Sequence, residues 1–200
     1  MNILRPFFFF CVFLGTLSFI PDSENRGPVT NPREIRLNEA EKEIFRLVNE
    51  YREQNHLPAV KFSPSLSYVA YCHVRDLAEN LPADERCNLH SWSEKGPWSS
   101  CCYTEDHMRA SCMWAKPREL TSYKSDGYEI AYWTNEVLFP DEFAAKAIRG
   151  WKKSPPHNEV MVNLDQWKTI SWKAMGVGVY KGYAVVWFGD APDEVMLASE

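Results

Sequence analysis

Apolar residues recur at helical spacing in two early segments of the chain. The first segment starts at Asn38, which together with Glu41 three residues later matches the capping box of a helix N-terminus. The second starts at Ser63-Pro64, a cap residue followed by proline at the first helical position, and closes at Leu81-Pro82. The stripes that these helices are predicted to bury are Ile44, Leu47, Val48 and Tyr51 in the first, and Leu66, Val69, Ala70, His73 and Leu77 in the second.

The pattern breaks over residues 91–127, where three tryptophans, three cysteines and several turn residues interrupt any periodicity. This composition predicts a loop that a disulfide staples, with a short helix around residues 105–112. A third helix then opens at Pro140-Asp141, with Asp141 as its predicted N-cap. It ends at Ser154-Pro155-Pro156, because consecutive prolines cannot continue a helix.

Two β-strands are predicted near the C-terminus, over about residues 172–180 and 183–189. The short Lys181-Gly182 turn joins them, and a further strand is expected at 167–171. Helices followed by an antiparallel hairpin predict an α+β fold in which the helices pack on a small antiparallel sheet.

Composition and charge narrow the class of protein. The 200-residue chain is 45% hydrophobic and 14% aromatic, with eight tryptophans, which is ample for a packed core. The net charge of -5 gives no basic footprint for nucleic acid, so nucleic-acid binding is not expected. Long runs of like charge are also missing, which disfavours a polyanion or an anionic membrane surface as the partner.

The first 20 residues predict a secretory signal peptide, with Arg5 in a positive n-region before an apolar run that extends to Ile20. This run is shorter than the ~20 residues of a spanning helix, so no transmembrane helix is expected after the signal is removed. An uncleaved anchor is the alternative. The rest divides into a flexible linker, the domain and an acidic tail, at residues 21–37, 38–190 and 191–200. The protein is therefore expected to be secreted or extracytoplasmic, in a periplasm or at a cell surface.

The number of cysteines is consistent with a protein that is exported to an oxidising compartment. Cys11 lies in the signal, and the other five cysteines predict disulfides with one thiol left over, because five is odd. The expected bridges join Cys112 to Cys101 or Cys102, and Cys72 to Cys87. The same loop offers an alternative, a structural zinc site formed by three of these cysteines and His107. An oxidising compartment favours the disulfides.

Three residues form the main candidate for chemistry: His90, Glu129 and His157. Neutral imidazoles bind zinc or copper well, and a carboxylate orients a ligating ring or occupies a coordination position. We expect the three side chains to converge on one polar cleft. His73, within the apolar stripe of the second helix, is predicted to be a core histidine with satisfied hydrogen bonds.

Four motifs occur in a recognisable order. They are Leu89-His90-Ser91, Gly127-Tyr128-Glu129-Ile130, Trp151-x-x-Ser154-x-x-His157, and Gly176-Val177-Gly178 before an aromatic strand. Together they resemble the CAP superfamily, which holds cysteine-rich secretory proteins, antigen 5 and plant pathogenesis-related proteins. The compact third motif is most similar to the bacterial, SCP-like branch. The resemblance covers about residues 40–189.

The resemblance implies an α-β-α sandwich with a central cleft, in which two histidines and two acidic residues bind a divalent metal in many members. By position, His90 and His157 match the histidines, and Glu129 matches the acid of a Gly-Glu-Asn motif. The chain departs from the pattern because Tyr128 separates the glycine from Glu129 and Ser154 stands where the second acid is usual. The segment between His90 and Glu129 is also longer. Glu159, close to His157, is a candidate replacement for that acid.

We expect a secreted CAP-like binding protein with no assigned catalytic residue. Its cleft would bind zinc or another divalent metal, a lipid or sterol, or an extracellular protein. One alternative is a metal-dependent, peptidase-like hydrolase in which Glu129 is the general base for a metal-bound water. Another is a structural cell-envelope protein. A Ser154 nucleophile with His157 as its base is disfavoured, because the chain has no nucleophile-elbow pattern.

Overall fold

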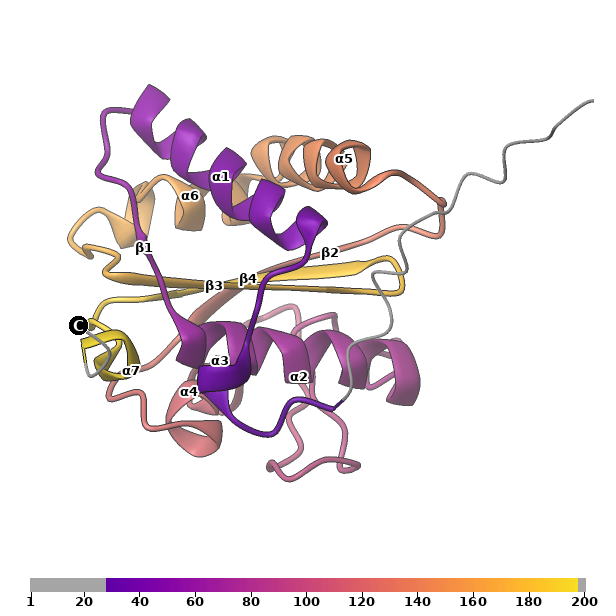
Figure 1. Ribbon diagram of the computed structural model, residues 1–200. Helices are drawn as coiled ribbons and strands as arrows, with labels where there is room; N and C mark the ends of the chain where they lie inside the picture. Colours follow the sequence, from indigo (N-terminus) through magenta and orange to yellow (C-terminus); the bar gives the residue numbers. More distant parts are fainter. Residues whose placement is uncertain (1–27, 198–200) are drawn as a thin grey trace, which may run out of the picture.

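The computed structural model describes residues 28–197 (Figure 1). The predicted signal peptide, the linker up to residue 27 and residues 198–200 of the acidic tail lie outside the described residues. The helices are η1 (Pro32–Glu34), α1 (Glu39–Gln54), α2 (Pro64–Asn80), α3 (Ala110–Trp114), α4 (Lys116–Leu120), α5 (Pro140–Lys153), α6 (Pro155–Met161), η2 (Asp165–Trp167) and α7 (Glu194–Leu197). The strands are β1 (Lys61–Phe62), β2 (Tyr128–Trp133), β3 (Ala174–Tyr180) and β4 (Tyr183–Gly189).

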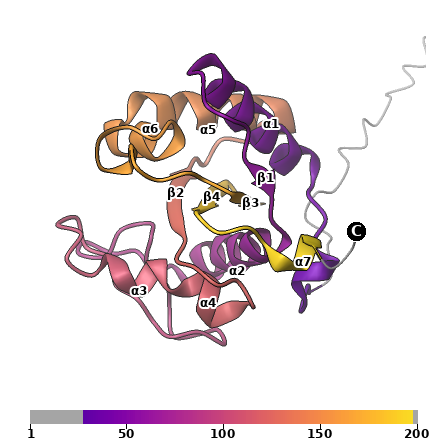
Figure 2. The same cartoon turned by 90° about the vertical axis from the view of Figure 1, so that its left-hand side faces the viewer.

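The elements form three layers. In Figure 1, α1, α5 and α6 lie above a four-stranded sheet, and α2, α3 and α4 lie below it. The turned view in Figure 2 shows the same order of layers, with β2 at one side of the sheet. The strand order is β1-β3-β4-β2, with β3 and β2 both antiparallel to β4 and β1 parallel to β3. The predicted α-β-α sandwich is therefore confirmed, although the two-residue β1 makes the sheet mixed.

The first two helices begin where the sequence predicts. Asn38 and Glu41 form a reciprocal capping box: the Glu41 N–H donates to Asn38 Oδ1 at 2.8 Å, and the Asn38 N–H donates to Glu41 Oε2 at 2.7 Å. Ser63 caps α2 by accepting from the Leu66 N–H at 3.0 Å. The hydrophobic stripes of both helices are buried against the sheet.

Other predicted boundaries were wrong. The N-cap of α5 is Phe139, not Asp141, because the fixed φ of Pro140 already suits the first helical turn. No strand forms at residues 167–171. The side-chain amide of Asn163 donates to the carbonyls of Trp167 and Ile170, so these carbonyls do not pair with a neighbouring strand. The short helix expected at 105–112 is displaced to α3, and α4 follows it.

Two elements that carry the site were not predicted. One is β2, whose residues are mostly buried on both faces and so lack the polar alternation of a half-exposed strand. The other is α6, which begins at Pro155, directly after Ser154 has ended α5. A proline pair that stops one helix can also occupy the first turn of the next, because its missing N–H groups are not needed there.

The Gly-Val-Gly motif of β3 sets the distance between the sheet and α2. A Cβ on Gly176 would lie 2.2 Å from the backbone carbon of Leu66 and the nitrogen of Ser67. A Cβ on Gly178 would lie 2.6 Å from the carbonyl group of Ala70. These glycines therefore let the backbones of α2 and β3 approach more closely than any side chain would allow.

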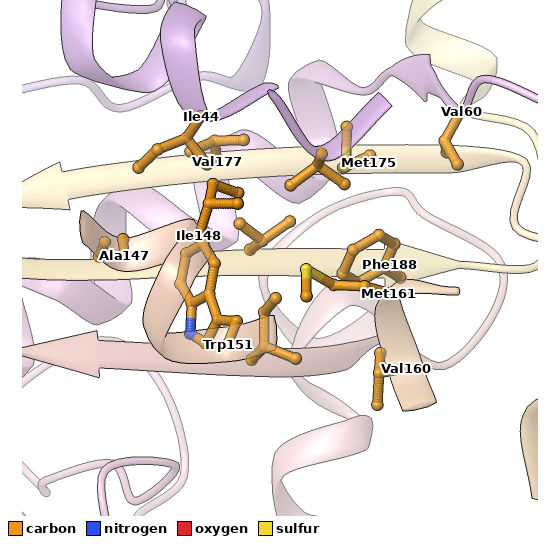
Figure 3. Packing of buried hydrophobic residues seen from close by; sticks show 14 of the residues in the cluster. Ile44, Val60, Ala147, Ile148, Trp151, Val160, Met161, Met175, Val177 and Phe188 are labelled. Carbon is orange, nitrogen blue, oxygen red and sulfur yellow. The ribbon is translucent and has the colours of Figure 1, made fainter. Parts of the chain in front are cut away.

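The β3 side chains that alternate with those glycines point into the upper core. Figure 3 shows Met175 and Val177 of β3 among Ile44 from α1, Trp151 from α5 and Met161 from α6, all of them buried. A second buried cluster lies between the sheet and α2 and includes Leu66, Val69, Val185, Trp187 and Trp92. Both faces of the sheet are thus covered, as the sandwich requires.

Two disulfides staple the loop between α2 and β2. Cys101 bonds to Cys112, one of the two predicted alternatives for Cys112, and Cys87 bonds to Cys102. The predicted Cys72–Cys87 bridge was wrong: Cys72 is the one free thiol among the described residues. It is held in the core on α2, where burial raises its pKa to about 12. Because all three cysteines of the zinc alternative are consumed in disulfides, that alternative is excluded, and the stapled loop is confirmed.

The described part of the acidic tail contacts the start of α2. Asp193 is buried and accepts hydrogen bonds from the hydroxyl groups of Ser63 and Ser65, at 2.6 and 2.9 Å. Within residues 28–197, none of the helices has the length and apolar character needed to cross a membrane.

Replacing Gly176 by alanine should strongly destabilise the fold. The new Cβ would overlap the α2 backbone, which cannot give way without moving the whole helix, so we expect the free energy of unfolding to fall by about 3 kcal/mol. Urea denaturation measures this. The control is Gly150→Ala on α5, whose Cβ meets only the edge of the Tyr132 ring at 3.2 Å and should change stability by less than about 1 kcal/mol. Equal effects of the two substitutions would contradict the close-approach argument.

Candidate functional site

A cleft of about 540 Å³ lies beside β2, the outer strand of the sheet. The stapled loop and α3 line it from the lower layer, and α6 and η2 line it from the upper layer. Figure 2 shows α3 and α6 on the same side of the molecule as β2. His90, Glu129 and His157 all line it, as predicted from the sequence. The three residues come from three different layers, so the cleft exists only where the layers meet.

Glu129 is the centre of a buried hydrogen-bond network. It lies on β2 with its side chain turned toward α2, where the His73 Nδ1 lies 2.5 Å from Oε2. The other carboxylate oxygen, Oε1, lies 2.7 Å from Nδ1 of His90. The second ring nitrogen of His73 lies 3.0 Å from the carbonyl oxygen of Ser91. Both oxygens of Glu129 are therefore engaged by histidines.

The network fixes where the protons lie. Burial alone raises the pKa of Glu129, but the charge of His73 and the hydrogen bonds from His73 and His90 outweigh it and hold that pKa below its ordinary value. The carboxylate is therefore ionised. Both nitrogens of His73 then face acceptors, so both carry hydrogen and the ring is an imidazolium. Trp92 stacks on this ring with centroids 4.3 Å apart and an interplanar angle of 6°.

His90 is oriented by its neighbours on the loop. Its backbone N–H donates to Asn88 Oδ1 at 3.0 Å, and its Nδ1–H donates to Glu129. The other ring nitrogen, Nε2, is not engaged by Glu129, as in the carboxylate–histidine arrangement that prepares a metal ligand.

His157 reaches the cleft from the upper layer on α6. Three contacts hold that helix in place: the Tyr51 hydroxyl donates to Asn158 Oδ1 at 2.9 Å, Arg52 donates to the Met161 carbonyl at 2.7 Å, and Trp172 Nε1 donates to the Val160 carbonyl at 2.8 Å. The rings of His157 and His90 lie 6.1 Å apart, centroid to centroid. Burial, and then the proximity of His90, lower the pKa of His157 to about 4, so this imidazole is neutral at pH 7.

Tyr128, Ser154 and Glu159 also line the cleft, as expected. Ser154 ends α5 and begins α6, and within residues 28–197 no hydrogen bond joins its hydroxyl to His157. The geometry therefore lacks the contact that a serine nucleophile would need. Glu159 lies two residues after His157 on α6.

The residues fit a metal ion only in part. Zinc–nitrogen bonds are about 2.0–2.1 Å long, so the two imidazoles are close enough for both to reach one ion after a small adjustment. Glu129 serves as the orienting acid of His90 in this geometry, not as a third ligand, because histidines hold both of its oxygens. In the part of the chain that the structure describes, no group of three or more histidine, cysteine or acidic side chains is arranged around one point.

Sequence reasoning missed several functional positions. His73 was assigned correctly as a core histidine, but its pairing with Glu129 depends on β2, which was not predicted. The aromatic side chains of Tyr103, Trp114 and Trp167 also line the cleft. They come from the loop and from η2, where the sequence has no hydrophobic periodicity that would indicate which side chains point inward. The predicted disulfides were the one sequence signal that the loop has a fixed position.

Replacing Glu129 by glutamine should cost stability. The amide NH2 group would face a ring N–H of His73 or His90, and the buried imidazolium would lose its counter-charge. We expect the free energy of unfolding to fall by about 3 kcal/mol. Glu50→Gln, which breaks an exposed ion pair to Arg46, is the matched control and should change it by less than about 0.5 kcal/mol. Comparable losses in both variants would refute the buried pair.

His157 should make the fold less stable in acid. Because its folded pKa of about 4 lies below the unfolded value of about 6.5, the unfolded state binds the extra proton between these values, and stability rises with pH there. This contribution is lost as pH falls from 6.5 toward 4. Denaturation of wild type and His157→Gln across that range should therefore show the wild type losing about 1–3 kcal/mol relative to the variant. Parallel curves would contradict the lowered pKa.

Comparison with known proteins matched the model of the cysteine-rich secretory protein family over residues 45–187, more than half of the chain. One similar solved structure is an extracellular protein containing an SCP domain from Bacillus anthracis str. Ames, with a TM-score of 0.52 and 20% identity over 83% of this chain and 45% of that one. Another is an outer surface protein from Borrelia burgdorferi, with a TM-score of 0.52 and 18% identity over 78% of this chain and 96% of that one. A search of curated proteins found no match.

The chain thus spans less than half the length of the Bacillus protein, and at these identities the structural likeness shows the fold. The segment that matches the family model contains His90, Glu129 and His157. With the sandwich and its cleft, these findings show that the chain belongs to the cysteine-rich secretory protein, or CAP, family.

Proposed function

We propose that this protein is an extracytoplasmic CAP-domain binding protein whose cleft holds a divalent metal ion, such as zinc, between His90 and His157. The observation that carries the proposal is the approach of the two imidazoles to 6.1 Å across one cleft. His90 directs Nδ1 to Glu129, which leaves Nε2 for a metal, and His157 is held neutral by burial. Imidazole nitrogens are suitable ligands for zinc.

The remaining coordination positions would be filled by water or by a bound partner. A zinc ion with only two protein ligands is open, and it would supply a Lewis acid to which a partner's oxygen or nitrogen atom binds. Ser154 and Glu159 line the same cleft, so such a partner would contact them. This supports a binding role for the cleft.

A metal-dependent hydrolase is the weaker candidate. It would need Glu129 as a general base with a free oxygen near the reacting water. Both oxygens of Glu129 accept hydrogen bonds from histidines, and the side chain is fully buried.

An extracytoplasmic location is supported by the two disulfides, which persist in oxidising compartments. The similar Bacillus protein is described as extracellular, and the Borrelia protein as an outer surface protein. The predicted signal peptide agrees with both. Peptide mapping of the mature protein would identify its N-terminus and test this assignment.

Zinc titration tests the metal proposal. Calorimetry at pH 7.5 should show one zinc site in the wild type, with affinity at least tenfold weaker in His90→Ala and in His157→Ala, because each loses one of two protein ligands. Affinity should also weaken at lower pH, where protons compete for the imidazoles. His107→Ala is the matched control, since His107 lines the same cleft but bonds to the Tyr103 hydroxyl. Titrations that do not differ between wild type and His157→Ala would end the proposal.

A further inference from the structure

The cleft continues past the two imidazoles to a wall of three aromatic rings. Trp114 comes from α3, Tyr128 from β2 and Trp167 from η2, and all three line the cleft. The ring centroids of Trp114 and Tyr128 lie 5.4 Å apart, and those of Tyr128 and Trp167 lie 4.9 Å apart. At these distances the rings pack on one another, so they form a continuous wall and not a cage around empty space.

The ionisable side chains that line the cleft include carboxylates and imidazoles but no ammonium or guanidinium group. Three glutamates and three histidines line it, and none of its lining residues is a lysine or an arginine. The charge of Glu129 is balanced by the His73 imidazolium behind it. The glutamates without such a counter-charge are Glu105, which contacts only the Asn88 amide at 3.4 Å, and Glu159. The cleft therefore favours a positively charged ligand.

Glu159 stands next to the aromatic wall. The Leu164 N–H donates to the Glu159 carbonyl at 2.9 Å, and the Trp167 N–H donates to the Leu164 carbonyl at 2.9 Å, so one compact turn joins the two cleft residues. Within residues 28–197, the Glu159 carboxylate forms no ion pair and no side-chain hydrogen bond, although the residue is half-buried.

We propose that this end of the cleft binds an arginine side chain presented by an extracellular peptide. The planar guanidinium would lie against the partly exposed Trp114 ring of the aromatic wall, and its N–H groups would pair with the Glu159 carboxylate. A guanidinium stacks on aromatic rings and donates to a carboxylate through two N–H groups at once, whereas an ammonium is more strongly hydrated. Gln166, also in the lining, offers an amide group for the peptide backbone.

This proposal goes beyond the metal site and does not require it. The residues that carry it lie on η2, α3 and the second turn of α6, and the ligand's charge is met by Glu159 without any imidazole. A neutral apolar ligand would leave that carboxylate desolvated and unpaired, and an anion would be repelled. The cleft volume of about 540 Å³ lies within the range of sites that enclose small ligands.

Calorimetry with two matched pentapeptides tests the proposal. One is acetyl-Gly-Gly-Arg-Gly-Gly-amide, and the other replaces arginine by citrulline, which keeps the shape and removes the charge. All titrations contain EDTA, so binding is measured without metal and its outcome is independent of the zinc experiment. We expect the arginine peptide to bind with a dissociation constant below about 1 mM and the citrulline peptide to bind at least tenfold more weakly. No binding of the arginine peptide, or equal binding of both, would overturn the proposal.

Variants then locate the site. Glu159→Gln should weaken the arginine peptide at least fivefold and leave the weak citrulline binding unchanged, because only the charged ligand uses the carboxylate. Trp114→Leu should weaken the arginine peptide by a similar factor. Glu50→Gln on the exposed face of α1 is the control and should match wild type. Near-ultraviolet circular dichroism checks that each variant is folded. Undiminished binding to folded Glu159→Gln would place the peptide elsewhere and refute the inference.

Discussion

The ionised carboxylate of Glu129, buried between two histidines, is the interaction on which the site depends. A charge without partners in this position would cost several kcal/mol, so the fold must deliver His73 from α2 and His90 from the stapled loop to the same point of β2. In doing so it ties the lower layer to the outer strand of the sheet. The contact with Glu129 engages Nδ1 of His90, so the other ring nitrogen, Nε2, is the one available to a ligand.

Two further constraints keep that point in place. Gly176 and Gly178 let α2 approach the sheet closely enough for His73 to reach Glu129. The disulfides from Cys87 to Cys102 and from Cys101 to Cys112 hold the loop that carries His90 and the cleft wall. The loop is thus held by covalent bonds, while the upper wall on α6 is held by hydrogen bonds from Tyr51, Arg52 and Trp172. The cleft lies between two walls that are fixed by different means.

The cleft lining offers two kinds of chemistry. The imidazoles of His90 and His157 would suit the proposed metal ion. The aromatic rings and the Glu159 carboxylate, which has no side-chain partner within residues 28–197, would suit the proposed organic cation. The negative charge on the upper wall comes from Glu159, two residues beyond His157 on α6, and Ser154 carries none.

Local patterns in the sequence determined α1 and α2 with their caps and the β3–β4 hairpin. The order of the motifs grouped His90, Glu129 and His157, and the partner of Cys112 stayed open between Cys101 and Cys102. Capping and periodic burial are local effects, so they are readable from neighbouring residues. Only the tertiary structure decided that β2 is a strand, that Pro155 begins α6, that Cys87 pairs with Cys102, and that His73 completes the network. Each of these depends on contacts between layers, because burial on both faces removes the alternation that marks a strand, and side chains far apart in sequence choose their partners by distance in space.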